Sequence, residues 1–267
     1  MNSPARFSIL FEGPDEAAEQ PETSFFTDLN LDQVFRAVTA GREEYDLTPF
    51  FRIPLHSERS VAYRHHVFQD LDNQAVSAAV AGFAEQMGKM REHLAQAGKL
   101  RYRYQKEHWF LDAAGIYCDA VGALANGLAA AEVESRGFTA FREYLASYTQ
   151  SAEFTSLIAE VRKVARALAT VRYCINIRGS RVRVSKYDGE ADYSAEVVQT
   201  FAKFARGAVR NYRVGFRSSP DMDHVEERIL ALVARLYPDV FAALDDFCAR
   251  HAAYVDDTIR AFDREIQ

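Results

Sequence analysis

Residues 73–98 read NQAVSAAVAGFAEQMGKMREHLAQAG, and this stretch decides the fold class. Its large apolar side chains recur every three or four residues, which is the spacing of one face of an α-helix. They are Val76, Val80, Phe83, Met87, Met90 and Leu94. A helix of some 20 residues spans about 30 Å. The sequence therefore predicts a mainly α protein, a packed helical core with long lever-like helices.

A second long helix is predicted over about residues 106–131, with an apolar stripe of Trp109, Ala113, Ile116, Tyr117, Ala120 and Leu124. Small residues in the same stretch permit close helix approach; they are Ala114, Gly115, Gly122 and Gly127. Shorter helices are predicted from Leu31 to Val38, from a Ser57 cap to about Leu71, over 138–149, and from a Ser151 cap onward.

The two ends of the chain have their own patterns. Residues 7–11 predict a short docked strand, and an acidic linker follows. Near the other end, Ser219-Pro220-Asp221 predicts a helix start, Pro238 a kink or restart, and the residues from Val240 one helix to the end. No cap follows that helix, so the natural protein is expected to continue beyond Gln267. The sequence predicts four regions. They are a short strand with an acidic linker (1–24), a helical core and lever (25–170), a basic β-containing insert (171–217) and returning lever helices (218–267).

Positive charge is concentrated between the long helices. The chain has a net charge of −6, whereas residues 171–217 carry ten Lys or Arg against four Asp or Glu. Within this region, residues 173–177 and 181–184 alternate apolar with polar around Arg178-Gly179-Ser180, which predicts a two-stranded hairpin. Residues 211–216 favour a further strand, after a helix that begins near Asp192. A cationic ribbon suits a phosphate backbone.

Composition narrows the class of protein. The chain is 48% apolar over 267 residues, enough for a sizeable core. Its three cysteines, Cys118, Cys174 and Cys248, are widely spaced and predict no disulfide framework. No run of about 18 apolar residues or signal peptide is found, so we expect a cytoplasmic protein that does not use a membrane.

Two stretches carry a resemblance to a known family. Phe26-Thr27-Asp28-Leu29-Asn30-Leu31-Asp32-Gln33 and the run from Pro54-Leu55-His56-Ser57 to His66-Val67 resemble the start of the core domain in MutS-related mismatch-repair ATPases. Ser8-Ile9-Leu10-Phe11 is similar to the opening segment of some members. The resemblance runs from about residue 7 to the end. It implies core and lever helices, a β-rich clamp that grips duplex DNA, homodimers, and coupling to a P-loop ATPase on the carboxyl side.

The chain departs from that family in two respects. It contains no Gly-x-x-x-x-Gly-Lys-Ser/Thr, the motif that cradles the phosphates of ATP. The present chain is therefore predicted not to be an enzyme and to hold no cofactor or metal. ATP and Mg²⁺ are expected only in a domain beyond it. It also has no amino-terminal mismatch-reading domain; Phe83-Ala84-Glu85 matches the wedge motif of that domain but falls in a predicted helix.

The predicted DNA-binding residues are the basic side chains of the hairpin and the following segment: Arg178, Arg181, Arg183, Lys186, Arg210 and Arg213. Two other interpretations of them are a solvated hairpin whose charges discourage edge pairing, and a helical scaffold that holds an acidic protein partner. Without a recognition-helix or zinc-finger signature, backbone contact is expected more than base readout.

Catalytic and metal sites receive little support from the sequence. His66 with Asp70, Asp221-Met222-Asp223-His224 and Asp256-Asp257 offer ligand atoms without metal-site spacing. Asp256-Asp257 is interpreted as a solvated helix face. The thiol of Cys174 lies among arginines that would lower its pKa, yet no His-Asp pattern accompanies it.

Overall fold

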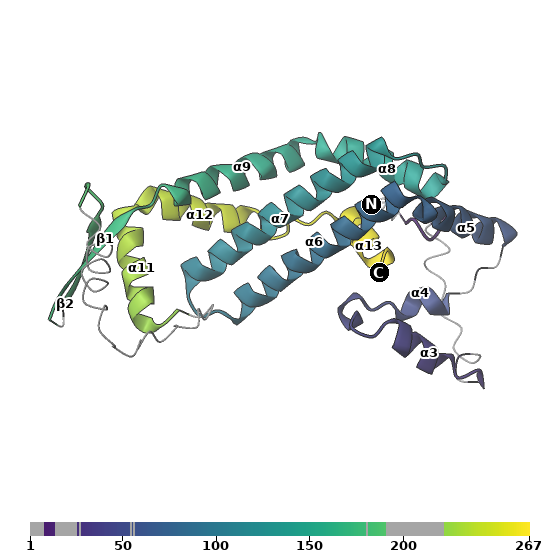
Figure 1. The fold of residues 1–267 in the computed structure, drawn as a ribbon, viewed down its shortest axis with the longest axis horizontal. Coiled ribbons are helices and arrows are strands. Elements are labelled where there is room, and N and C mark those ends of the chain that lie inside the picture. Colours follow the sequence, from purple (N-terminus) through teal and green to yellow (C-terminus); the bar gives the residue numbers. More distant parts are fainter. Residues whose placement is uncertain are drawn as a thin grey trace, which may run out of the picture.

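The computed structural model describes residues 8–13, 26, 28–53, 55, 57–179, 181–190 and 222–267. The protein is mainly helical, with one small antiparallel hairpin in the described part, as the sequence predicts. Figure 1 shows an elongated bundle with the hairpin at one end and the chain termini towards the other. The elements are α3 (Leu31–Val38), η1 (Glu43–Tyr45), α4 (Thr48–Arg52), α5 (Glu58–Asp72), α6 (Gln74–Lys99), α7 (Arg103–Ala130), α8 (Arg136–Thr149), α9 (Ala152–Ala169), β1 (Tyr173–Arg178), β2 (Arg181–Lys186), α11 (His224–Leu236), α12 (Pro238–Arg250) and α13 (Asp257–Glu265).

The long helices α6 and α7 lie side by side and form the centre of the bundle (Figure 1). Most of the predicted α6 stripe is buried, and Leu94 packs at its edge. Close approach depends on Gly127, because a Cβ atom there would lie 2.8 Å from the Cβ of Ala79 on α6. Gly122 differs, since a Cβ there would meet no atom within 4 Å. Of these two glycines, Gly127 is therefore the one at which a larger side chain would collide with α6.

Helices α8, α9 and α12 pack around α7, and polar side chains fix where several helices begin. Ser57, Asn73, Ser135 and Ser151 each accept a hydrogen bond from a backbone amide of the first turn. The predicted Ser57 and Ser151 caps are confirmed. Among the helices of the described residues, α7 alone is long and apolar enough to cross a membrane by length and composition, a property that core helices of soluble proteins share.

The prediction of one helix from Val240 to the end is wrong. Helix α12 ends at Arg250, and α13 begins at Asp257 after a short connection. Asp256 explains the restart, because its carboxylate accepts hydrogen bonds from the amides of Thr258 and Ile259. Its own amide donates to Tyr117 Oη over 3.1 Å, and its carboxylate also accepts from Tyr144 Oη over 2.6 Å. Asp256 is thus a helix cap joined to the core, and its interpretation as part of a solvated helix face is also wrong.

Residues 8–13 dock on the bundle without forming the predicted strand. Ile9 and Phe11 are buried, but the backbone makes bends instead of a ladder. The amide of Ile9 donates to Glu265 Oε2 of α13 over 2.8 Å, and Arg64 of α5 donates to the Leu10 carbonyl over 3.3 Å. Side chains and not a neighbouring strand satisfy the backbone hydrogen bonds of this segment, and a short apolar run does not reveal such partners.

Helix α3 is confirmed, but its apolar face is only partly covered. Phe35 packs between Phe26 and Phe51, with ring centroids 5.1 Å and 4.4 Å away. Val34 and Val38 stay exposed, and no residue of the helix is buried. This amino-terminal part contacts the bundle chiefly through arginines, including Arg264 of α13, which donates to the Tyr45 carbonyl over 2.6 Å.

The hairpin follows α9 directly and rests on α11 (Figure 1). Helix α11 begins at His224, three residues after the predicted Ser219-Pro220-Asp221 start, because Asp223 and Glu226 form a reciprocal capping box. Pro238 restarts the chain as α12. The predicted helix near Asp192 and the predicted strand at 211–216 lie outside the described residues, as do residues 219–221.

Candidate nucleic-acid interface

The hairpin has two chemically different faces. Its register pairs Arg178 with Arg181 and Asn176 with Arg183, and directly opposed residues of an antiparallel pair share a face. The three arginines therefore project together from one side of the ribbon, and all three are exposed. Among the described residues, none of them forms an ion pair or a side-chain hydrogen bond. We call Arg178, Arg181 and Arg183 the arginine face.

The opposite face is apolar and attaches the ribbon to the bundle. Val184 packs into a cluster around Val233 and Ala234 of α11 and Phe241 of α12. Lys186 pairs with Tyr173 on this face, and its Nζ atom lies 4.9 Å from the centroid of the Tyr237 ring. A cation over an aromatic ring is stabilising. Lys186 thus lies apart from the arginines with which the sequence grouped it.

Three of the six predicted DNA-binding residues are brought together by this geometry, namely Arg178, Arg181 and Arg183. Lys186 occupies the other face. Arg210 and Arg213 lie outside the described residues. Like charges directly opposed in a ladder are destabilising, so the Arg178–Arg181 pair has a cost that a bound anion would remove.

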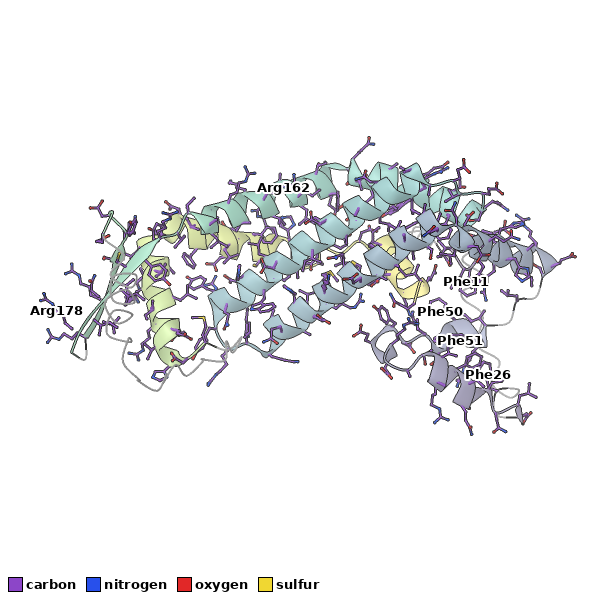
Figure 2. The ribbon with its side chains drawn as sticks, viewed as in Figure 1. Phe11, Phe26, Phe50, Phe51, Arg162 and Arg178 are labelled. Atoms are coloured by element: carbon purple, nitrogen blue, oxygen red, sulfur yellow. The ribbon has the colours of Figure 1, made fainter. Side chains whose placement is uncertain are left out.

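Helix α9 adds basic residues that the sequence analysis missed. Arg162, Lys163 and Arg166 are exposed on α9, and Arg172 is exposed between α9 and β1. Residues 161–186 contain eight Lys or Arg and no Asp or Glu. Figure 2 shows Arg162 on α9 and Arg178 on the ribbon at the end of the bundle. A charge count that crossed the helix–hairpin boundary would have found them, because the basic run begins inside the helix.

An acidic side chain, Glu190, contacts the ribbon near the start of β1. The Cys174 thiol donates a hydrogen bond of 3.4 Å to Glu190 Oε2. Desolvation, followed by this carboxylate, raises the pKa of Cys174, so the expectation that arginines lower it is wrong. The pKa of Glu190 is lowered, chiefly because the backbone amide of Asp188 donates to it. A thiol with a raised pKa is a poor nucleophile at neutral pH.

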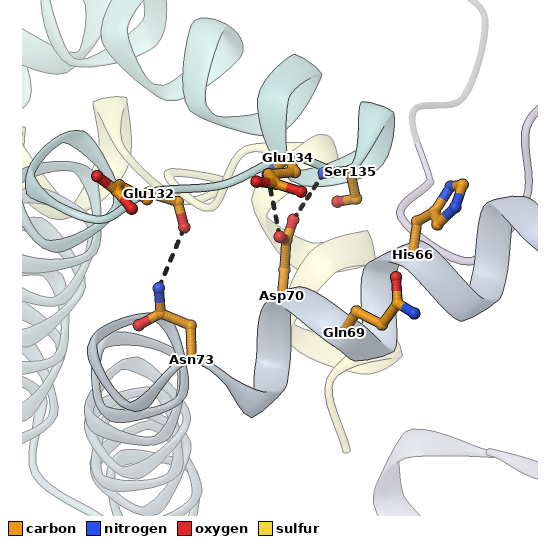
Figure 3. A pocket seen from close by; sticks show the side chains of 7 residues that line it. All are labelled: His66, Gln69, Asp70, Asn73, Glu132, Glu134 and Ser135. Carbon is orange, nitrogen blue, oxygen red and sulfur yellow. Dashed lines mark hydrogen bonds between the residues drawn. The ribbon is translucent and has the colours of Figure 1, made fainter.

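A polar pocket of about 330 Å³ lies at the opposite end of the bundle (Figure 3). Asp70 is a buried side chain of this pocket, and its two oxygens accept hydrogen bonds of 3.0 Å from the amides of Glu134 and Ser135. Its carboxylate therefore anchors the start of α8 instead of pairing with His66, which lines the same pocket. Within the described ranges, no group of three His, Cys, Asp or Glu side chains is placed to hold a metal ion.

Two of the segments that carry the MutS resemblance are in contact, namely Ser8-Ile9-Leu10-Phe11 and the start of α5. Besides the Arg64 bond to Leu10, Tyr63 Oη donates to the Ser8 carbonyl over 3.2 Å, and Arg59 pairs with Glu12 at 2.6 Å. Comparison with known proteins gives no match: no family model, no curated protein and no solved structure matches the chain. The resemblance therefore rests on its sequence motifs alone.

Proposed function

We propose that this chain binds the backbone of duplex DNA through the arginine face of the ribbon. One observation carries the proposal: eight basic residues without an acidic one run from α9 through the hairpin of a chain whose net charge is −6. Guanidinium groups suit phosphates because their planar donors bond two oxygens at once. The arginine face is exposed and makes no ion pair within the described residues, so its donors are available to phosphates.

Backbone contact fits the ribbon better than base reading. Three arginines on one short face offer charge and donors, but charge alone carries no sequence information. Binding should therefore depend strongly on salt and weakly on sequence. Arg162, Lys163 and Arg166 of α9 extend the same positive field and are expected to speed association.

The family resemblance extends this proposal. In MutS-related proteins a clamp on long lever helices grips DNA and communicates with an ATPase. We accordingly propose that the ribbon acts as a clamp, that the helical bundle passes movement on, and that ATP and Mg²⁺ act in a domain outside this chain. A homodimer, a cytoplasmic location and the lack of catalysis by this chain belong to the same proposal.

The test compares two variants of the full chain. The variant Arg178→Ala, Arg181→Ala, Arg183→Ala removes the arginine face, and Lys186→Ala removes one positive charge from the other face of the same ribbon. With a labelled duplex and fluorescence anisotropy, the triple variant should lose affinity by roughly tenfold or more. Lys186→Ala should change it much less.

Equal affinity of the triple variant and the natural chain would rule out the arginine face as the DNA contact. That result would favour the rival interpretation, a helical scaffold that holds an acidic protein through its basic residues. Circular dichroism of both variants checks that the helices are retained, since all four side chains are exposed and contribute little burial.

A further inference from the structure

The junction between α7 and α12 contains two carboxyl groups and one arginine. Glu107 of α7 and Asp245 of α12 have side chains only 14% and 24% exposed. Arg103 Nε lies 2.8 Å from Glu107 Oε1, and Arg103 also pairs with Asp245 Oδ1. A single guanidinium thus faces two carboxyl groups in a partly desolvated site, where two negative charges are costly.

One buried oxygen of the pair lacks a donor. Glu107 Oε2 accepts no hydrogen bond from any described residue, whereas Asp245 Oδ1 is paired with Arg103. Arg103 holds both carboxyl groups around one guanidinium. A proton held between them supplies the missing donor and removes one of the two charges, as in other paired carboxyl groups.

Few other ionisable groups surround the pair. On α7 it has Arg103 and the phenol of Tyr104, and on α12 the thiol of Cys248, which donates to the Glu107 carbonyl. On α6, His93 stacks on Trp109. On α9, Glu160 is paired with Arg250 and His251 instead.

Burial, and then the Asp245 carboxyl, raise the pKa of Glu107 to about 7, against the opposing effect of Arg103. The titration of Glu107 therefore falls in the neutral range.

We propose that Glu107 and Asp245 share one proton that locks α12 onto α7, and that this lock makes the attachment of the ribbon sensitive to pH. The site is next to the attachment point. Tyr104 of α7 packs edge-on against Phe241 of α12, with ring centroids 4.7 Å apart, in the cluster that holds Val184 of the ribbon. Loss of the proton leaves two carboxylates facing each other across the α7–α12 contact.

The sign of the effect follows from the raised pKa. The shared proton stabilises the folded chain fully below the unfolded pKa of about 4.5, and this contribution is lost as pH rises through about 7. The shift between those two values sets an upper limit of roughly 300-fold on the change in the unfolding equilibrium constant. The inference does not depend on DNA binding, so either can fail without the other.

Three measurements test it. In ¹³C-glutamate NMR of the full chain, with Glu107→Gln to assign the signal, the Glu107 carboxyl should titrate well above its ordinary pKa. Urea unfolding gives the ratio of the unfolding equilibrium constant at about pH 8 to that at about pH 5. This ratio should be at least about tenfold larger for the natural chain than for Glu107→Gln. The glutamine amide donates to Asp245 permanently and so replaces the proton.

Glu160→Gln is the matched control, because Glu160 also pairs with an arginine of the bundle but has a lowered pKa. Glu160→Gln should keep the change in the unfolding equilibrium constant that the Glu107 proton causes between about pH 5 and about pH 8. Amide hydrogen exchange at about pH 8 should be slower in α11 and β2 of Glu107→Gln than of the natural chain. A Glu107 titration midpoint near its ordinary value, or equal pH dependence of the natural chain and Glu107→Gln, would overturn the proposal.

Discussion

Replacing Gly127 by alanine tests whether the closeness of α6 and α7 limits the packing of the bundle. The new Cβ atom would lie 2.8 Å from the Cβ of Ala79, well inside the ordinary carbon–carbon separation of about 3.5–4.0 Å. The same substitution at Gly122, on the same helix, meets no atom within 4 Å. The two sites therefore share helix propensity and differ in available space.

The expected energies have opposite signs at the two sites. Alanine in a helix interior is about 1 kcal/mol more favourable than glycine, so Gly122→Ala should raise the free energy of unfolding by about that amount. Overpacking costs about 1–3 kcal/mol. Because that cost exceeds the gain in propensity over most of its range, Gly127→Ala should lower the free energy of unfolding by up to about 2 kcal/mol.

Urea unfolding followed by circular dichroism measures these differences, and Ala79→Gly provides the compensating change. The double variant Ala79→Gly, Gly127→Ala moves one methyl group from α6 to α7 and should return close to the natural stability. This corresponds to a coupling energy of about 1–3 kcal/mol. If Gly127→Ala stabilises the chain as much as Gly122→Ala does, the helix contact is looser than described and the reasoning fails.

Three further predictions concern single side chains. Asp70→Ala should lower the free energy of unfolding by about 3 kcal/mol in denaturant titrations, because it removes two charge-assisted bonds from the start of α8. Lys186→Ala should lower it by only about 0.5–1 kcal/mol, since it removes an exposed cation–ring contact; a larger loss would mean that the lysine does more than cover Tyr237. Burial raises the pKa of Cys118 to about 12, so mass spectrometry should find Cys118 unmodified by iodoacetamide in the folded chain, with Cys174 modified first.

Much of the fold follows from local sequence signals. The stripe from Val76 to Leu94 and the caps Ser57 and Ser151 act within a few residues, and the corresponding helices form where these signals place them. Period-two alternation around Gly179 likewise indicates the hairpin. These features need only backbone geometry and neighbouring side chains, so one sequence is enough to find them.

The errors concern long-range partners. The break before Asp256 depends on Tyr117 and Tyr144, which are more than 100 residues away. Residues 7–11 look like a strand because they form a short apolar run, but the amide of Ile9 binds Glu265 at the far end of the chain. The exposure of Val34 on α3 likewise depends on what the rest of the chain leaves uncovered.

The candidate site was predicted in part. Alternation along β2 already placed Arg181 and Arg183 on one face, and the register added Arg178 to them. The separate position of Lys186 follows from the register and from Tyr237, which lies about 50 residues further along. The basic residues of α9 were overlooked because charge was counted only from the hairpin onward.

The salt dependence of DNA binding tests the central claim most directly. For B-form DNA the logarithm of the binding constant falls against the logarithm of salt concentration with a slope of about −0.9 per phosphate contact. If each of the three arginines neutralises one phosphate, the variant without Arg178, Arg181 and Arg183 should show a slope flatter by about 2.7. Identical slopes for the natural chain and the variant would contradict the assignment of the arginine face as the DNA contact.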